Sequence, residues 1–141
     1  MTAGLELVRA VQAGSAPVPG IARLLGFTLD SVEPGQVVAV LATRDDMTNP
    51  MGTVHGGVAA TLLDTVMGCA VHTALDEGES YTTTDLQVRY VRPVIPGTTL
   101  TATGTVTHRG RRLATGEGRL VDDRGQLVAH GTTSCMIFGP G

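Results

Sequence analysis

The sequence predicts a single α+β domain in which a curved antiparallel sheet covers one long helix. The chain has 141 residues, a length typical of one domain with its own core. An apolar run from His55 to Leu75 predicts a helix that is apolar around most of its circumference. Segments on both sides of this run read as strands joined by short turns, which favours antiparallel pairing. Such a helix needs wide cover, and a strongly curved sheet supplies it.

The remaining elements follow in order along the chain. A short amphipathic helix is expected over 5–12, with Leu5, Val8 and Val11 on one face, and a further helical turn over 21–26. Strands are expected at 27–32, 36–43, 82–91, 99–108, 112–121 and 126–138. Because nearly every connection after the helix is short, the last four strands are expected to pair in chain order as a meander. A polar loop from Thr43 to Gly52 precedes the long helix. We therefore divide the chain into an N-terminal helical segment, 1–25, and a sheet-and-helix domain, 26–141.

Composition argues against several classes of protein. The net charge of −3 gives no support for nucleic-acid binding, which usually needs a basic patch. No apolar stretch reaches the length of a membrane span, and the N-terminus lacks the features of a signal peptide. Cys69 and Cys135 lie far apart in apolar surroundings, so we expect free thiols in a reducing cytoplasm and no metal site.

Asp64 is the one acidic residue in the middle of the long helix. A buried carboxylate is costly unless it is paired or used chemically. Most of its neighbours one turn away are small, including Ala60 and Gly68, which leaves space above the carboxylate. Two interpretations stay open. Asp64 either bonds a neighbouring group while the small residues allow close packing, or it acts as a general base or nucleophile.

The triplet His55-Gly56-Gly57 opens the same helix. The first turn of a helix carries unpaired N–H groups and a partial positive charge, and glycines there let another group approach the backbone. Such a site can stabilise a developing oxyanion. The alternative is that the glycines serve a tight turn and His55 only caps the helix.

Gly56 and Asp64 are about 12 Å apart along the helix axis, at 1.5 Å per residue. One carbonyl cannot contact both on the same helix. Two antiparallel copies of the helix in a two-fold dimer would place the N-terminus of one beside Asp64 of the other. The spacing therefore predicts a composite site between subunits.

Asn49, the triplet His55-Gly56-Gly57, Asp64 and the following stretch TTTDLQVRYVRPVIPG resemble the hot-dog-fold acyl-CoA thioesterases. The resemblance is to the PaaI-like group (phenylacetate-pathway and 4-hydroxybenzoyl-CoA thioesterase-like) and extends from about Gly26 to Phe138. It implies a hot-dog fold, with a central helix inside a curved sheet. It also implies a homodimer, commonly paired into a tetramer, that hydrolyses an acyl-CoA to a carboxylic acid and free CoA. No cofactor or metal takes part, and the acyl group would be small and aromatic or of medium chain length.

The resemblance also implies roles for individual residues. Asp64 matches the acid that activates water or attacks the thioester carbon, and Gly56 matches the residue whose backbone N–H polarises the thioester carbonyl. Asn49 matches a polar loop residue near that carbonyl or the attacking water. His55 matches a histidine that supports the site, and Thr83 matches a hydroxyl residue that orients the water or the carboxylate.

Some of these assignments stay open. Thr82 and Thr84 flank Thr83, and a slip of one residue would exchange the faces of the strand. Related groups use Glu in place of Asp64, so the residue pattern does not separate a general base from a nucleophile. For the CoA phosphates we assign Arg109 and Arg111, in a basic hairpin that could otherwise only solubilise a sheet edge.

Two other functions remain as alternatives on the same fold. A hot-dog hydratase or dehydratase would use a histidine with an acid in a different motif, whereas here the acid lies inside the helix. A non-catalytic acyl-CoA-binding hot-dog protein would have no need of a buried acid. The thioesterase interpretation accounts for both Asp64 and the glycine-rich helix start.

Overall fold

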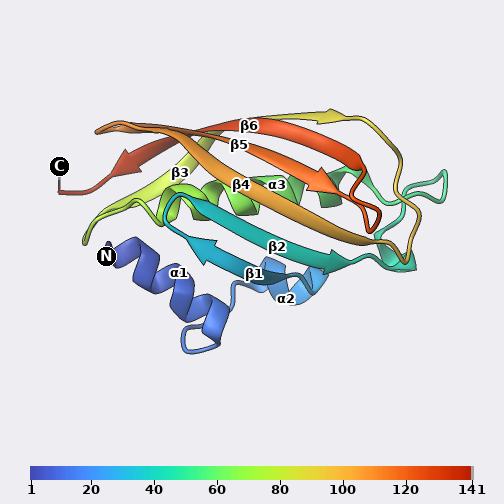
Figure 1. The fold of residues 1–141 in the computed structure, drawn as a ribbon, viewed down its shortest axis with the longest axis horizontal. Coiled ribbons are helices and arrows are strands. Elements are labelled where there is room, and N and C mark those ends of the chain that lie inside the picture. Colours follow the sequence, from blue (N-terminus) through green and yellow to red (C-terminus); the bar gives the residue numbers. More distant parts are fainter. Residues whose placement is uncertain (141) are drawn as a thin grey trace.

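The computed structural model describes residues 1–140 and confirms the α+β class, with six antiparallel strands curved around one long helix (Figure 1). The helices are α1 (Ala3–Ala13), α2 (Gly20–Leu25) and α3 (Gly56–His72), with a short 3₁₀ turn, η1 (Asp45–Met47), before α3. The strands are β1 (Thr28–Glu33), β2 (Gln36–Ala42), β3 (Ser80–Tyr90), β4 (Thr99–Arg109), β5 (Leu113–Val121) and β6 (Leu127–Phe138). The long helix ends at His72, about one turn earlier than expected, because a connection with two turns over residues 73–79 leads into β3.

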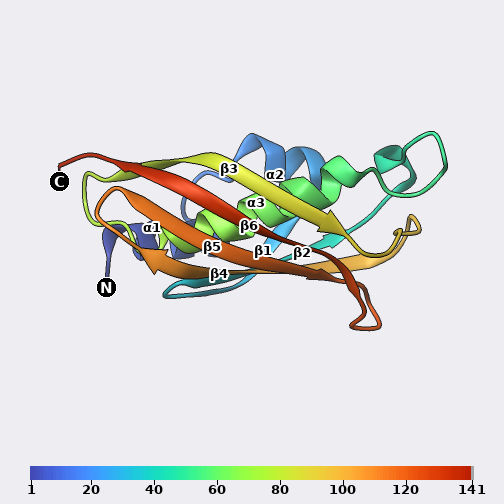
Figure 2. The same ribbon diagram turned by 90° about the horizontal axis from the view of Figure 1, so that it is seen from above.

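The strand order differs from a simple meander in one respect. The sheet order is β1-β2-β4-β5-β6-β3, with antiparallel pairing throughout. The expectation that β3 would continue into β4 as neighbours is therefore wrong. The connection over 91–98 contains Pro93 and Pro96 and is too long for a tight hairpin, so β3 forms the far edge of the sheet beside β6. Figure 2 shows β3 and β6 together along α3.

A row of glycines allows the sheet to curve closely around α3. Gly104, Gly118 and Gly131 lie opposite one another on β4, β5 and β6. A Cβ at Gly104 would lie 2.3 Å from the carbonyl carbon of Val66, so the helix backbone rests directly on the strand. A Cβ at Gly118 would lie 3.1 Å from Cγ of Met67. The middle of the sheet has no room for side chains where α3 crosses it.

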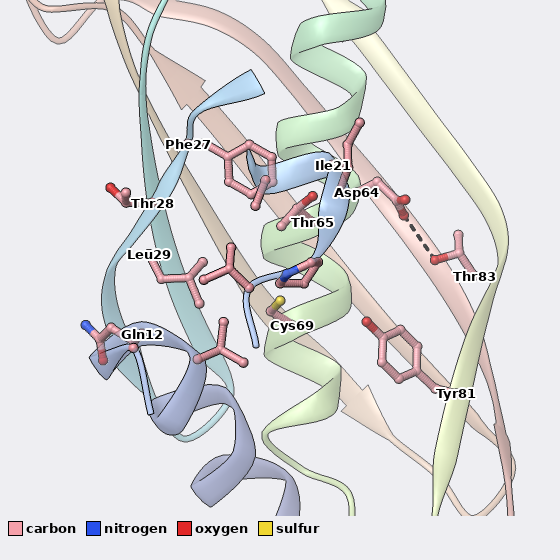
Figure 3. Close-up of a pocket in the computed structure, with 15 residues that line it drawn as sticks. Gln12, Ile21, Phe27, Thr28, Leu29, Asp64, Thr65, Cys69, Tyr81 and Thr83 are labelled. Atoms are coloured by element: carbon pink, nitrogen blue, oxygen red, sulfur yellow. Dashed lines mark hydrogen bonds between the residues drawn. The ribbon is translucent and has the colours of Figure 1, made fainter. Parts of the chain in front are cut away.

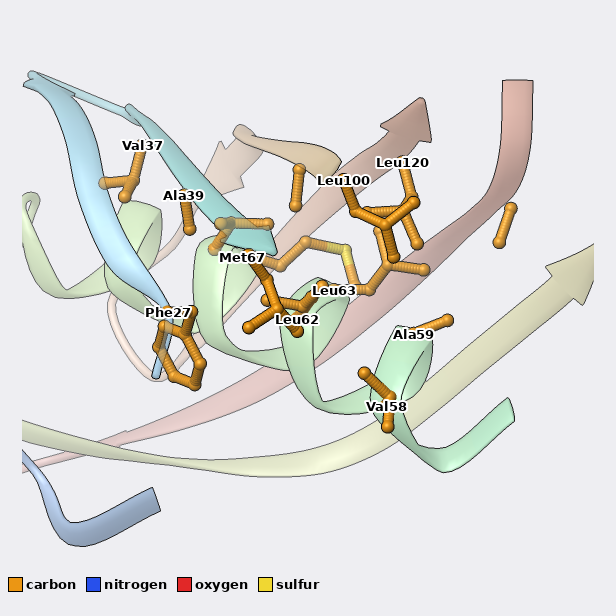
Figure 4. Packing of buried hydrophobic residues seen from close by; sticks show 14 of the residues in the cluster. Phe27, Val37, Ala39, Val58, Ala59, Leu62, Leu63, Met67, Leu100 and Leu120 are labelled. Carbon is orange, nitrogen blue, oxygen red and sulfur yellow. The ribbon is translucent and has the colours of Figure 1, made fainter. Parts of the chain in front are cut away.

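The core lies between α3 and the concave face of the sheet (Figure 4). Leu62, Leu63 and Met67 on α3 are fully buried, as are Leu100 on β4 and Leu120 on β5. These aliphatic side chains fill the space on either side of the glycine row. The apolar circumference read from the sequence is therefore explained by a sheet that covers most of the helix.

The N-terminal segment closes one edge of the sheet. Figure 1 shows α1 beside β1, and α2 leads into the start of that strand. Leu5 and Val8 of α1 are buried, as expected from the amphipathic pattern. Arg9 Nε donates to the Val32 carbonyl at 3.2 Å, and Gln12 Nε2 donates to the Asp30 carbonyl at 3.1 Å. These bonds occupy the outer edge of β1, whereas β3, at the opposite edge, pairs only with β6 within residues 1–140.

The close contact at Gly104 makes a prediction about stability. The variant Gly104→Ala should lower the free energy of unfolding by about 3 kcal/mol, because its methyl group meets helix backbone that cannot rotate away. Urea denaturation would measure the change. Gly20→Ala serves as the control, since a Cβ there has only one neighbour, at 3.8 Å, and should cause no loss. An unfolding free energy for Gly104→Ala equal to wild type would contradict this account of the helix–sheet contact.

Candidate active site

Asp64 projects from the middle of α3 toward β3, where Thr83 holds its carboxylate (Figure 3). Thr83 Oγ1 donates to Asp64 Oδ1 at 3.0 Å. Thr82 is exposed, and Thr84 Oγ1 donates instead to the Ser134 carbonyl at 3.1 Å. Of the three neighbouring threonines, the structure therefore places Thr83 against the acid. A β-bulge between Thr83 and Asp85 breaks the strict alternation of the strand at this point.

Asp64 and Thr83 border a pocket of about 380 Å³ between α3 and the N-terminal segment. The wall opposite the acid is mostly apolar and includes Val11, Ile21, Phe27 and Leu29. A lone carboxylate at the side of an apolar pocket is an arrangement that can act on a polar centre attached to an apolar group.

The sequence did not predict that the N-terminal segment would take part in this pocket. The boundary at residue 25 treated that segment as an addition to the sheet-and-helix domain, yet α1, α2 and the start of β1 supply most of the pocket wall. Tyr81 also lines the pocket and was not singled out. Its position two residues before Thr83 on the same strand was the available signal, because residues i and i+2 share a face.

At the start of α3, the backbone N–H of Gly56 makes no hydrogen bond within the described residues. His55 caps the helix, and its Nδ1 accepts a hydrogen bond from the Gly57 N–H at 2.8 Å. The Val58 N–H donates to the His55 carbonyl at 2.9 Å. The Gly56 N–H has no acceptor within residues 1–140. Because Nδ1 of His55 accepts a hydrogen bond, the proton of the neutral ring is on Nε2, which is free to donate.

Asn49 organises the loop that leads to this helix start. Its Oδ1 accepts from the backbone N–H groups of Met51 at 3.0 Å and Thr53 at 3.2 Å, and its Nδ2 donates to Thr53 Oγ1 at 2.9 Å. One amide hydrogen of Asn49 is left over from these contacts. Asn49, His55 and Gly56 together line a second pocket of about 390 Å³.

The predicted site residues therefore form two groups within one chain. Asp64 and Thr83 border one pocket, whereas Asn49, His55 and Gly56 border another. Strand β3 connects the groups, since Tyr90, seven residues after Thr83, donates its hydroxyl to the Gly56 carbonyl at 2.6 Å. The separation agrees with the spacing of about 12 Å expected along the helix.

Burial determines the protonation of the groups around Asp64. Burial, together with a smaller effect of the charge of Asp64, raises the pKa of the Cys69 thiol to about 11. Burial also lowers the pKa of His72, which lies against the Tyr81 ring with centroids 5.4 Å apart. At neutral pH these shifts favour a protonated thiol and a neutral imidazole. Neither group is therefore a ready nucleophile or cation beside the acid.

The two arginines assigned to phosphate binding differ in their surroundings. Arg109 donates to the Ala74 carbonyl at 3.2 Å and forms an ion pair with Glu79, so it joins the end of α3 to the start of β3. Arg111 is exposed in the hairpin between β4 and β5. Phosphate binding by either residue stays a prediction.

Two kinds of feature are absent from the described part of the chain. Within residues 1–140, no three His, Cys, Asp or Glu side chains come together in a way that could hold a metal ion. No helix in that range is long and apolar enough to span a bilayer.

Comparison with known proteins identifies relatives over nearly the whole chain. The family model described as "Thioesterase superfamily" matches residues 51–129. Acyl-coenzyme A thioesterase 13 of Homo sapiens is 30% identical over 133 residues, which cover 93% of this chain and 94% of the relative. Acyl-coenzyme A thioesterase PaaI of Escherichia coli is 28% identical over 108 residues, covering 77% of this chain and 75% of the relative.

Solved structures agree with these sequence matches. A phenylacetic acid degradation-related protein of Ralstonia eutropha superposes with a TM-score of 0.84 at 33% identity, over 92% of this chain and 98% of the other. The E. coli PaaI structure has the same fold, with a TM-score of 0.85 at 23% identity, over 96% and 94% of the two chains. The expected hot-dog fold is thereby confirmed, and the chain belongs to the thioesterase superfamily, among the PaaI-like proteins.

Proposed function

We propose that the protein is an acyl-CoA thioesterase that hydrolyses small aromatic or medium-chain acyl-CoA to the free acid and CoA. The observation that carries this proposal is the Asp64 carboxylate, held by Thr83 beside an apolar pocket of about 380 Å³. A pocket of that size accommodates a small acyl group. With the acyl group bound there, the thioester carbon would lie beside the Asp64 carboxylate. The relatives are named as acyl-CoA thioesterases, which agrees with this chemistry.

Two chemical routes fit the position of Asp64. As a general base, its carboxylate takes a proton from water while the water oxygen attacks the thioester carbon. As a nucleophile, a carboxylate oxygen attacks the carbon itself, and water then hydrolyses the resulting anhydride. In both routes the carbon–sulfur bond breaks and the CoA sulfur receives a proton. Thr83 holds one carboxylate oxygen, which leaves the other free to act. Neither route consumes a cofactor.

The negative charge on the carbonyl oxygen needs a donor, and the free N–H of Gly56 is the candidate. Gly56 lies too far along α3 from Asp64 of the same chain. In the proposed active dimer, Gly56 of one subunit therefore acts together with the partner's Asp64. His55 Nε2 and the remaining amide hydrogen of Asn49 border the same pocket as Gly56 and are further donors to the carbonyl or the water.

The two sheet edges support a particular dimer. Side chains of α1 occupy the edge of β1, whereas the outer edge of β3 pairs with nothing within residues 1–140. Two β3 edges can pair antiparallel about a two-fold axis. Thr83 contacts Asp64 and Tyr90 contacts Gly56, so β3 runs antiparallel to α3. Pairing centred between these residues would bring the Gly56 end of one subunit to the Asp64 region of the other.

Asp64→Asn tests the catalytic role directly. The amide cannot accept a proton or attack, so we expect kcat to fall by about 10²–10⁴-fold. The assay is release of free thiol from a panel of acyl-CoAs, which also distinguishes hydrolysis from mere binding or hydration. Asp123→Asn, at an exposed turn, is the control and should retain wild-type rates. Near-normal activity of a folded, dimeric Asp64→Asn protein would remove this residue from the mechanism.

Mixing two inactive variants tests whether the site is shared. Gly56→Val crowds the helix start, since a Cβ there already lies 3.1 Å from the Tyr90 ring, and should block the donor. Mixed with Asp64→Asn by joint refolding, half of the dimers would be hybrids with one intact composite site. Roughly a quarter of wild-type activity should then return. Recovery of no activity from proven hybrid dimers would show that each site lies within one chain.

Arg111 is the exposed candidate for the CoA phosphates. Reversing its charge with Arg111→Glu should raise KM roughly 3- to 10-fold and change kcat little, because a distant phosphate contact aids binding and not chemistry. Steady-state kinetics at low ionic strength would measure both constants. Arg124→Glu, at the turn between β5 and β6, makes the same charge change and should leave KM unaltered. Equal KM values for the two variants would remove Arg111 from CoA binding.

A further inference from the structure

We propose that Tyr81 is a specificity residue whose hydroxyl donates a hydrogen bond to an oxygen on the third or fourth carbon of the acyl group. The proposal rests on the thioesterase function above and deepens it by naming a substrate class, acyl thioesters oxygenated near the thioester. It concerns a residue outside the groups already assigned to water activation and carbonyl binding.

The Tyr81 ring lies across the face of α3 next to the acid. A Cβ at Gly68 would be 2.8 Å from the Tyr81 hydroxyl oxygen, so the absence of a side chain at Gly68 creates the space for that oxygen. Gly68 is one helical turn after Asp64. Thr83 and Tyr81 share one face of β3, and they place a hydroxyl at the acid and a second hydroxyl one turn beyond it (Figure 3).

The Tyr81 hydroxyl is not used by the fold. Within residues 1–140, no protein group accepts a hydrogen bond from it, whereas the other tyrosine, Tyr90, is bonded to the Gly56 carbonyl. No side-chain oxygen or nitrogen in this range is both fully buried and without a partner. The Tyr81 oxygen therefore reaches open space, and the pocket that it borders is the one that contains Asp64.

The hydroxyl is available as a donor and not as a base. Burial is the main cause that raises the pKa of the Tyr81 phenol above its ordinary value, so the O–H stays protonated at neutral pH. A tyrosine hydroxyl facing an otherwise apolar wall is favourable only when its hydrogen bond is made. A substrate oxygen at the right distance from the thioester carbon would accept this hydrogen bond, whereas a plain hydrocarbon chain would not.

The position of the acceptor oxygen along the acyl chain follows from the spacing of residues on α3. Gly68 lies about 6 Å along the axis from Asp64. The thioester carbon must be within about 3 Å of the attacking oxygen at Asp64. This approach runs across the helix axis, so the carbon lies level with Asp64 and the full separation of about 6 Å along the axis remains between it and the Tyr81 hydroxyl beside Gly68. Subtracting one hydrogen-bond length of about 3 Å leaves about 3 Å between the thioester carbon and the acceptor, which corresponds to an oxygen on the third acyl carbon, or on the fourth when the chain bends. Opposite this point the wall is apolar, with Phe27 and Leu29, and suits the hydrocarbon remainder of the acyl group.

The test compares matched substrates and matched enzymes. Thiol release would be measured for hexanoyl- and octanoyl-CoA and for their 3-hydroxy and 3-oxo forms. The wild-type protein should prefer the oxygenated forms in kcat/KM. Tyr81→Phe keeps the ring and should reduce kcat/KM for the oxygenated forms by roughly 2- to 10-fold, the range for one neutral hydrogen bond, while leaving the plain chains unchanged. Thr82→Val removes a hydroxyl from the exposed face of the same strand and should alter neither.

Each other outcome is informative. An equal fall for oxygenated and plain chains would assign Tyr81 to the support of Asp64 and overturn the specificity role. Wild-type protein without any preference overturns the proposal even if Tyr81→Phe fails to fold, and so does activity confined to other acyl groups such as phenylacetyl-CoA. If the wild-type protein releases no thiol from any acyl-CoA, the proposed function itself fails.

Discussion

The contact of the α3 backbone with Gly104 is the constraint on which the rest of the structure depends. At this crossing the helix touches the strand without an intervening side chain. Gly118 on β5 continues this close contact with α3, whereas a Cβ at Gly131 on β6 would meet the backbone of β3. Because the sheet can then curve, its two ends reach around the helix. Aliphatic side chains fill the inner surface of the sheet on either side of the glycine row. A scarcity of aromatic residues is compatible with this core, since close backbone approach leaves little volume to fill.

Strand β3 carries the arrangement of the site. It lies at the edge of the sheet and meets α3 at both of the places where chemistry is expected, through Thr83 at Asp64 and through Tyr90 at Gly56. One strand thus positions an acid and an amide donor at a fixed separation within a chain. Within residues 1–140 the outer edge of the same strand has no partner, so a dimer formed along it would relate the two groups across subunits. In the proposed dimer, site geometry and assembly would therefore both depend on this one strand.

The N-terminal segment gives the acid its environment. Without the side chains of α1, α2 and the start of β1, the carboxylate of Asp64 would face open solvent on that side of α3. With them, it borders an apolar pocket whose other polar groups come mainly from α3 and β3. The segment also covers the edge of β1 through Arg9 and Gln12, which leaves β3 as the sheet edge without a partner among residues 1–140.

The sequence by itself determined the fold class and the long helix, because apolar periodicity is a local signal. It also singled out Asp64 and the glycine-rich helix start, and the family resemblance added Asn49 and Thr83 to the predicted site. Only the tertiary structure decided that β3 pairs with β6, since strand order depends on contacts between distant segments. It also selected Thr83 from three neighbouring threonines through the geometry at a bulge. The N-terminal wall of the pocket had no signal in the sequence, because a pocket is defined by residues far apart in the chain that packing brings together.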